Sequence, residues 1–200
     1  MNTAIENVLL NRLLGKTPGD DGSLANEWRR ELRAFADATV APAAAEIDQA
    51  QKLPRPIIQA LIDAGYLGFL VSSKYGGRGG DFRRYGALCA EIGRACSCTR
   101  SLLTVHDMVC QAIQRWGTDA QKDQWLPLLA SGEKLGAFCL SEAEVGSDAA
   151  SVRTIAEATR GGFLLNGSKK WITFGQIANV LLVIALYEGR PTAFIVDGTT

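Results

Sequence analysis

The hydrophobic pattern of this chain changes its period once, near residue 133. Up to about residue 132 the apolar residues recur at spacings of three to five, as they do along one face of an α-helix. Beyond Gly132 they come in short runs rich in Val, Ile, Phe and Trp, bounded by Gly, Pro and Asn, which is typical of β-strands. The pattern predicts an α+β chain with an all-α domain at residues 23–132 and an antiparallel β-domain at residues 133–200. Residues 1–22 are expected to be a flexible N-terminal segment.

Local signals place the ends of the helices. A capping box of Thr118 and Gln121 begins one helix, Asp81 begins another, and Gly65 follows the end of a third. The expected helices run from Ser23 to Val40, from Pro54 to Gly65, from Asp81 to about residue 95, from about Thr99 to Trp116, and from Thr118 to about residue 130.

Five runs in the second half predict strands. These are LGAFCLS (135–141), GGFLLNG (161–167), KKWITFG (169–175), NVLLVIALY (179–187) and PTAFIVD (191–197). Asn166-Gly167 predicts a hairpin between the second and third runs, because a type I′ turn needs positive φ at both central residues. A sheet of this size would have open edges, so the β-domain is interpreted as incomplete.

Composition excludes several classes of function. The chain has 21 basic residues (Lys and Arg) and 21 acidic residues (Asp and Glu). It therefore has no net charge that would attract it to nucleic acid or to an anionic membrane. No apolar run is long enough to span a bilayer, and the N-terminus lacks the pattern of a secretory signal. The five cysteines are an odd number without a C-x-x-C pair, which favours a reduced cytoplasm. We therefore expect a soluble cytoplasmic protein without a metal site.

Two features that suggest chemistry are interpreted as structural. His106 is the single histidine and lies in an apolar helical run, which favours a helix residue near a pocket or core over a catalytic one. The glycine-rich segment 75–80 (YGGRGG) matches neither G-x-G-x-x-G nor the phosphate-loop pattern, and no strand precedes it. It is expected to link two helices.

Two segments together carry a family resemblance. Residues 137–148 read AFCLSEAEVGSD, and Trp171-Ile172-Thr173 follows. They resemble the acyl-CoA dehydrogenase signature, in which C-x-T-E-P-x-x-G-S-D is followed by W-I-T-N; residues 75–81 and 115–133 match as well. The resemblance implies a flavoenzyme with FAD, whose helical N-terminal domain precedes an incomplete antiparallel β-barrel-like domain. The family's C-terminal four-helix domain is absent from these residues.

The resemblance also implies a flavin site. It places the main chain of Phe138 and Leu140 along the isoalloxazine ring, Ser141 at the N1/O2 edge, Trp171 and Ile172 beside the ring, and Thr173 near N5. Ser147, in the Gly-Ser-Asp loop, is the implied substrate contact. The chain departs from the signature at Ala143, where the family has Pro, and at Phe174, where it has Asn.

Arg100 and Thr104 suggest the substrate class. They lie four residues apart on one face of the helix that resembles the family's acyl-pocket helix. The pair is similar to the Arg and Ser that hold the distal carboxylate in glutaryl-CoA dehydrogenases. The run RACSCTRSLLTVHDM also resembles the acyl-carrier-protein dehydrogenases of polyketide extender-unit pathways, which we favour over glutaryl-CoA. Alternatively, Arg100 pairs internally with Asp107 or Glu91.

The remaining expectations concern the complete protein. The family's catalytic base is a glutamate of the C-terminal domain, so no base is assigned in this chain. The implied partners are an acyl thioester on carrier protein or CoA, an electron-transfer flavoprotein or another electron acceptor, and identical subunits in a homodimer or homotetramer. A non-catalytic module that binds thioesters or docks a carrier protein is the rival interpretation.

Overall fold

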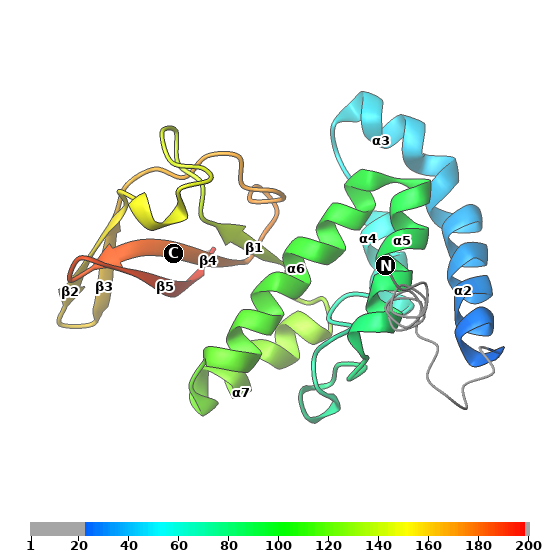
Figure 1. Ribbon diagram of the computed structural model, residues 1–200, viewed down its shortest axis with the longest axis horizontal. Coiled ribbons are helices and arrows are strands. Elements are labelled where there is room, and N and C mark those ends of the chain that lie inside the picture. The colour runs from blue at the N-terminus through cyan, green and yellow to red at the C-terminus, as the bar shows by residue number, and fades with distance from the viewer. Residues whose placement is uncertain (1–22, 199–200) are drawn as a thin grey trace, which may run out of the picture. The chain divides into compact units, whose positions relative to one another are not determined.

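The computed structural model describes residues 23–198 (Figure 1). The chain divides into two compact units. The first unit contains the described residues up to 60 together with residues 80–100. The second contains residues 61–79 and those from 101 onward. The expected flexible segment at residues 1–22 lies outside the described residues.

The expected helices occur where the local signals predicted them, whereas α3 was not predicted. Asp81 caps α5 by accepting hydrogen bonds from the amides of Arg83 and Arg84, both at 2.9 Å. Thr118 and Gln121 form the expected capping box. Gly65 follows α4 with a φ of 64°, a left-handed conformation that glycine adopts at little cost. The α-helices are α2 (Ser23–Phe35), α3 (Ala44–Ala50), α4 (Arg55–Asp63), α5 (Phe82–Ala95), α6 (Ser97–Trp116) and α7 (Asp119–Ala130).

The helix expected to run to Val40 changes its geometry before that residue. Regular α-helix ends at Phe35, a π-helical turn η1 (Ala36–Val40) follows, and a 3-10 turn η2 (Ala41–Ala43) leads into α3. Pro42 lies in this turn and has no amide hydrogen to continue the helical ladder. Two further 3-10 turns are η3 (Ser73–Tyr75) and η4 (Ala149–Ser151).

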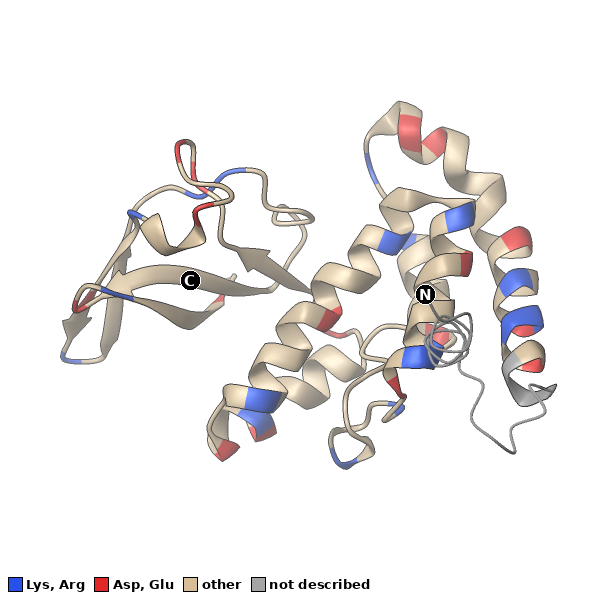
Figure 2. Ribbon diagram, in the orientation of Figure 1, with Lys and Arg blue, Asp and Glu red and all other residues tan. Residues whose placement is uncertain are grey.

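Ion pairs join helices within the first unit. Arg33 of α2 donates two hydrogen bonds of 3.0 Å to the carboxylate of Glu91 on α5. Arg94 bonds to the same carboxylate at 3.2 Å and also to Asp37. The hydrogen bonds from Arg33, aided by Arg94, lower the pKa of Glu91 despite its burial. Figure 2 shows α2 carrying basic and acidic side chains together, whereas β1 and β4 carry neither.

The sheet of the second unit is centred on β4. Its strands are β1 (Gly136–Cys139), β2 (Ile155–Thr159), β3 (Gly162–Asn166), β4 (Val180–Tyr187) and β5 (Arg190–Asp197). β5 pairs with β4 along its whole length, from Val180↔Asp197 to Tyr187↔Arg190. Since a strand has two edges, β1 and β2 share the other edge, at Gly136↔Val180 and Ile155↔Leu186.

The expected order of helices followed by a sheet is confirmed, but the sheet is mixed rather than wholly antiparallel as expected. The β2–β3 and β4–β5 pairs are antiparallel, whereas β1–β4 and β2–β4 are parallel. β2 was not expected, because its sequence IAEAT holds two alanines and a glutamate; pairing with β3 and β4 outweighs that weak intrinsic preference.

The hairpin predicted at Asn166-Gly167 is wrong. Asn166 pairs with Ile155 at the end of β3, and the tight turns lie at residues 160–161 and 188–189. In the second turn Glu188 and Gly189 have φ of 50° and 74°, so both adopt the left-handed conformation of a type I′ turn. The strand expected at 169–175 is also absent, since Trp171 and Phe174 have φ of 60° and 59° and interrupt an extended chain.

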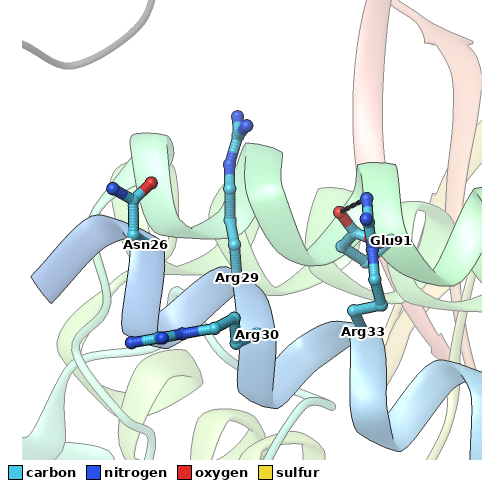
Figure 3. A pocket seen from close by; sticks show the side chains of 5 residues that line it. All are labelled: Asn26, Arg29, Arg30, Arg33 and Glu91. Carbon is cyan, nitrogen blue, oxygen red and sulfur yellow. Dashed lines mark hydrogen bonds and ion pairs between the residues drawn. The ribbon is translucent and has the colours of Figure 1, made fainter. Parts of the chain in front are cut away.

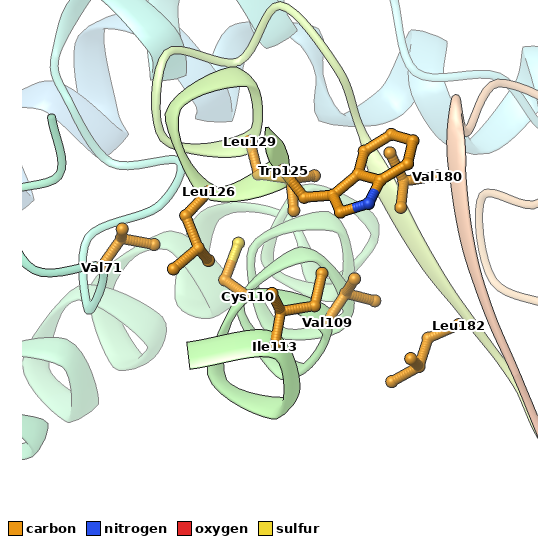
Figure 4. Close-up of a cluster of buried hydrophobic side chains, with 9 residues drawn as sticks. All are labelled: Val71, Val109, Cys110, Ile113, Trp125, Leu126, Leu129, Val180 and Leu182. Atoms are coloured by element: carbon orange, nitrogen blue, oxygen red, sulfur yellow. The ribbon is translucent and has the colours of Figure 1, made fainter. Parts of the chain in front are cut away.

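A buried cluster joins helices to the sheet within the second unit (Figure 4). Side chains from α6, α7 and β4 meet there, with one residue from the segment after α4. The members are Val71, Val109, Cys110, Ile113, Trp125, Leu126, Leu129, Val180 and Leu182. The change from helix to strand near residue 133 therefore lies inside one unit, and the boundary predicted at residues 132 and 133 stays a prediction.

Candidate functional site

The first signature segment follows β1. Phe138 is half-buried, and its side chain packs against the core cluster, so only its main chain remains for the role implied at a flavin. Leu140 and Ser141 come directly after the strand and are half-buried. The Phe138 side chain thus belongs to the packing around the core cluster, and the role of its main chain at a flavin stays a prediction.

Glu142 is the polar centre of this region, and it was not among the residues predicted from the sequence. Its Oε1 accepts hydrogen bonds from Lys169 Nζ at 2.7 Å, Thr154 Oγ1 at 2.6 Å and the Thr154 amide at 2.9 Å. Its Oε2 accepts from the amide of Arg153 at 2.7 Å. The side chains of Glu142 and Lys169 are only 8% and 11% exposed, so the two charges form a buried ion pair.

The hydrogen bonds set the protonation state of Glu142. Burial alone would raise its pKa, because it removes water from the charged form. The bonds from Lys169, from the Thr154 hydroxyl and from the two amides outweigh burial and lower the pKa to about 2. Glu142 is therefore a carboxylate that holds three segments of the chain together.

Lysine residues bring the second signature segment beside the first. Lys169 Nζ donates to the carbonyl oxygen of Leu140 at 3.0 Å, and the amide of Lys170 donates to the carbonyl oxygen of Ser141 at 2.8 Å. Residues 140–142 and 169–170 are thus adjacent, although about thirty positions separate them in the sequence. The two segments that carry the family signature form one local structure.

The side chain of Trp171 is exposed to solvent. The residue is 82% exposed and left-handed, with a φ of 60°, a conformation that costs a residue with a side chain roughly 1–2 kcal/mol. Thr173 is exposed and Ile172 is half-buried. Lys170 Nζ lies 5.0 Å from the centre of the Trp171 ring. An indole held open to solvent, with a hydroxyl two residues away, suits a flat aromatic ligand.

The Gly-Ser-Asp loop is closed by its own contacts. Asp148 accepts a hydrogen bond from Ser151, and Arg153 pairs with Glu144. Val145 is buried, whereas Ser147 at the loop tip is exposed. This exposure leaves Ser147 accessible to a ligand; its contact with substrate stays a prediction.

Arg100 and Thr104 lie on α6, as predicted. The stem of Arg100 packs on α5, where its Cγ would be 3.3 Å from a Cβ added at Gly93. Thr104 Oγ1 donates to the carbonyl oxygen of Ser101 at 3.1 Å. Glu91, one of the two partners considered for Arg100, is bound by Arg33 and Arg94. The role of Arg100 and Thr104 in substrate selection stays a prediction.

A hollow of about 530 Å³ lies in the first unit, and none of the predicted site residues lines it (Figure 3). Asn26, Arg29, Arg30, Arg33 and Glu91 line it. Figure 3 shows Arg29 and Arg30 pointing in different directions, while Arg33 points to Glu91. The hollow therefore lacks convergent groups that would hold one anion.

His106 is buried, as the sequence analysis favoured. It is 0% exposed in α6, and both its ring nitrogens have main-chain partners: Nε2 lies 3.0 Å from the carbonyl oxygen of Leu129, and Nδ1 lies 3.1 Å from the amide nitrogen of Gly136. Burial lowers its pKa to about 4. Within residues 23–198 no three His, Cys, Asp or Glu side chains gather as a metal site. In the same residues, every helix is too short or too polar to cross a membrane.

Comparison with known proteins identifies the family. Residues 24–133 match the acyl-CoA dehydrogenase N-terminal domain, and residues 137–200 match the middle domain. The short-chain specific acyl-CoA dehydrogenase of Clostridium acetobutylicum is 35% identical over 175 residues, covering 84% of this chain and 46% of its own. An acyl-CoA dehydrogenase of Bacillus subtilis is 39% identical over 178 residues, covering 86% of this chain and 47% of its own.

Solved structures agree with these relatives. A glutaryl-CoA dehydrogenase from Mycobacterium smegmatis in complex with FADH2 matches with a TM-score of 0.84 and 31% identity, covering 95% of this chain and 47% of its own. A structure described as the electron transferring flavoprotein of Acidaminococcus fermentans matches with a TM-score of 0.82 and 29% identity, covering 91% of this chain and 48% of its own. This chain spans about half the length of the curated relatives it matches. With both signature segments joined in one local structure and two family domains matched in order, the chain belongs to the acyl-CoA dehydrogenase family.

Proposed function

We propose that the complete protein is an FAD-dependent dehydrogenase of short acyl thioesters, and that residues 138–141 and 171–173 form its flavin-facing surface. The observation that carries this proposal is the junction of the two signature segments through Lys169 and Lys170. The junction brings an exposed Trp171 and Thr173 to a region that also holds Ser141.

The residues present fit a flavin. A flavin held by these residues would supply a hydride acceptor for the β-carbon of an acyl group whose α-proton is removed by a base. Trp171 supplies apolar area that would exclude water from one side of a planar ring. The hydroxyls of Ser141 and Thr173 can donate hydrogen bonds to polar ring edges, where negative charge accumulates on reduction. We assign no catalytic base among residues 23–198.

The substrate class follows from the relatives and from α6. The Clostridium relative is named as short-chain specific, and the Mycobacterium structure as a glutaryl-CoA dehydrogenase. These names favour a CoA thioester over a carrier-protein thioester. Arg100 offers a guanidinium fork that matches a carboxylate, which supports an acyl group with a polar or acidic end. We propose an electron-transfer flavoprotein as electron acceptor, and a homodimer or homotetramer as the assembly.

The test begins with FAD. The complete protein is titrated with FAD and then assayed with butyryl, octanoyl and glutaryl thioesters, each on CoA and on carrier protein. We expect bound flavin, its bleaching by a short acyl-CoA, and weaker reaction with octanoyl-CoA. Preference for the carrier-protein thioester would favour the polyketide extender-unit role, and protein that binds thioester without FAD would favour the non-catalytic module.

A further inference from the structure

His106 joins three elements of the second unit through its two ring nitrogens. The carbonyl oxygen of Leu129, in the last turn of α7, can only accept a hydrogen bond, so Nε2 must carry the proton. The amide of Gly136, the first residue of β1, can only donate, so Nδ1 must be the acceptor. The two partners therefore determine one neutral tautomer. Because the pKa of His106 is about 4, this neutral form prevails at pH 7.

The same contact brings β1 unusually close to α6. A Cβ added at Gly136 would lie 2.9 Å from the Cβ of Val109, a separation that folded proteins essentially never show. Helix α6 thus meets the first residue of β1 twice, by a hydrogen bond from the amide to His106 and by direct packing on Val109. Leu135, just before the strand, is bound in turn by Asn179, whose amide oxygen lies 3.0 Å from the Leu135 amide.

Gly136 is the first residue of the strand that leads to the candidate flavin surface. β1 is only four residues long, and Phe138 is two residues beyond Gly136. Leu140 and Ser141, which hold the second signature segment through their carbonyl oxygens, follow directly. β1 pairs with β4 from Gly136 to Cys139, and the hydrogen bond from the Gly136 amide to His106 fixes the position at which this short strand begins.

We infer that His106 is a positioning residue, which sets where β1 leaves helix α6 and thereby where the flavin-facing main chain lies. The inference rests on the proposed function for the flavin, and on the distances at His106 and Gly136 for the strand. His106 has its contacts with Leu129 and Gly136 and is not proposed to touch flavin or substrate. It acts through β1.

The test compares three variants in the complete protein. His106→Gln retains one acceptor and one donor on an amide of similar reach. His106→Leu removes both, which leaves the Gly136 amide without its buried acceptor and the Leu129 carbonyl with the Gly132 amide as its partner. Leu102→Ala, at a fully buried position of the same helix, is the control for general loss of stability. Nitrogen NMR of the imidazole should report a protonated Nε2 and an unprotonated Nδ1 in the unchanged protein.

Amide hydrogen exchange and FAD titration give the readouts. We expect His106→Leu to speed exchange at Gly136 and Phe138 at least tenfold relative to Leu102→Ala, and to weaken FAD binding at least tenfold. His106→Gln should stay within about threefold of the unchanged protein in both. If His106→Leu and Leu102→Ala behave alike, His106 is only a core residue and the inference is overturned.

The two measurements, amide exchange and FAD titration, distinguish a failure of this inference from a failure of the proposed function. If the unchanged protein binds no FAD, the proposed function fails, and amide exchange alone still decides whether His106 positions β1. If exchange at β1 rises while FAD affinity stays the same, β1 is positioned by His106 but does not govern the flavin site, which overturns the functional part of the inference.

Discussion

Lys169 Nζ lies 2.7 Å from Glu142 Oε1, and this buried ion pair joins the two halves of the family signature. The same ammonium reaches the carbonyl oxygen of Leu140 at 3.0 Å, so one lysine binds both the side chain and the main chain of the first segment. Besides the lysine, the Thr154 hydroxyl and the amides of Arg153 and Thr154 donate hydrogen bonds to the Glu142 carboxylate.

Removing one charge of this pair should destabilise the protein strongly. Glu142→Gln leaves the Lys169 ammonium buried without its counter-charge, and we expect a loss of about 3–5 kcal/mol in the free energy of unfolding. Glu144→Gln is the matched control, since Glu144 pairs with Arg153 while both side chains are 67% and 71% exposed; it should cost less than about 1 kcal/mol. Urea unfolding monitored by circular dichroism measures both. Equal losses in the two variants would show that the Glu142 pair contributes no more than a surface pair.

Stability should fall as the pH drops from about 6.5 to 4. The folded-state pKa of His106 is lowered from 6.5 to about 4, so the unfolded chain binds a proton that the folded protein excludes in that window. The stabilisation is fully present above pH 6.5, decreases below it, and changes no further below pH 4; the total is about 3 kcal/mol. Unfolding titrations at pH 7, 5.5 and 4.5 measure the decrease.

His106→Gln should abolish the loss of stability between pH 6.5 and 4, because an amide does not titrate. Glu142 acts in a lower window: its folded-state pKa is lowered from 4.5 to about 2, so its contribution is present above pH 4.5 and is lost as the pH falls toward 2. Glu142→Gln should therefore keep the decrease between pH 6.5 and 4.5. A His106→Gln variant with an unchanged decrease there would contradict the assignment to His106.

Trp171 should matter to flavin binding rather than to stability. Trp171→Asn keeps a residue that tolerates the left-handed backbone and removes an indole that is 82% exposed, so the unfolding free energy should change by less than about 0.5 kcal/mol. FAD affinity, measured by fluorescence titration, should fall at least tenfold. Trp116→Ala is the control, because Trp116 is similarly exposed at 79% but lies at the end of α6. If both variants bind FAD equally well, Trp171 is not at the flavin.

Arg100 should select the acyl group. A guanidinium makes two parallel bonds to a carboxylate, so Arg100→Gln should lower the apparent affinity for glutaryl-CoA by about 2–4 kcal/mol. Arg100→Lys should recover this only in part, since an ammonium lacks the planar fork. Steady-state kcat and KM with glutaryl-CoA and butyryl-CoA provide the measurement, with Arg115→Gln on the same helix as control. An unchanged preference in Arg100→Gln would indicate that Arg100 serves an internal contact.

Local chemistry was sufficient to predict most of the helical half. Helix ends depend on residues three or four positions apart, so the Asp81 cap and the Thr118–Gln121 box could be recognised from sequence alone. The pairing of the strands was harder to predict from the sequence. β2 forms from a sequence of low strand preference because β3 and β4 supply its partners, and Asn166-Gly167 is not a turn because Asn166 pairs with Ile155.

By itself, the sequence determined the change from helix to sheet, the helix caps and the two signature segments, because these depend on hydrophobic period and on short spacings. Only the tertiary structure decided that Glu142 and Lys169 are ion-pair partners, that His106 binds Leu129 and Gly136, and that Trp171 projects into solvent. The pair partners lie 27 positions apart and the His106 contacts span 23 and 30. Contacts of that range depend on how the strands and helices of the second unit pack together, and no local pattern of residues encodes that packing.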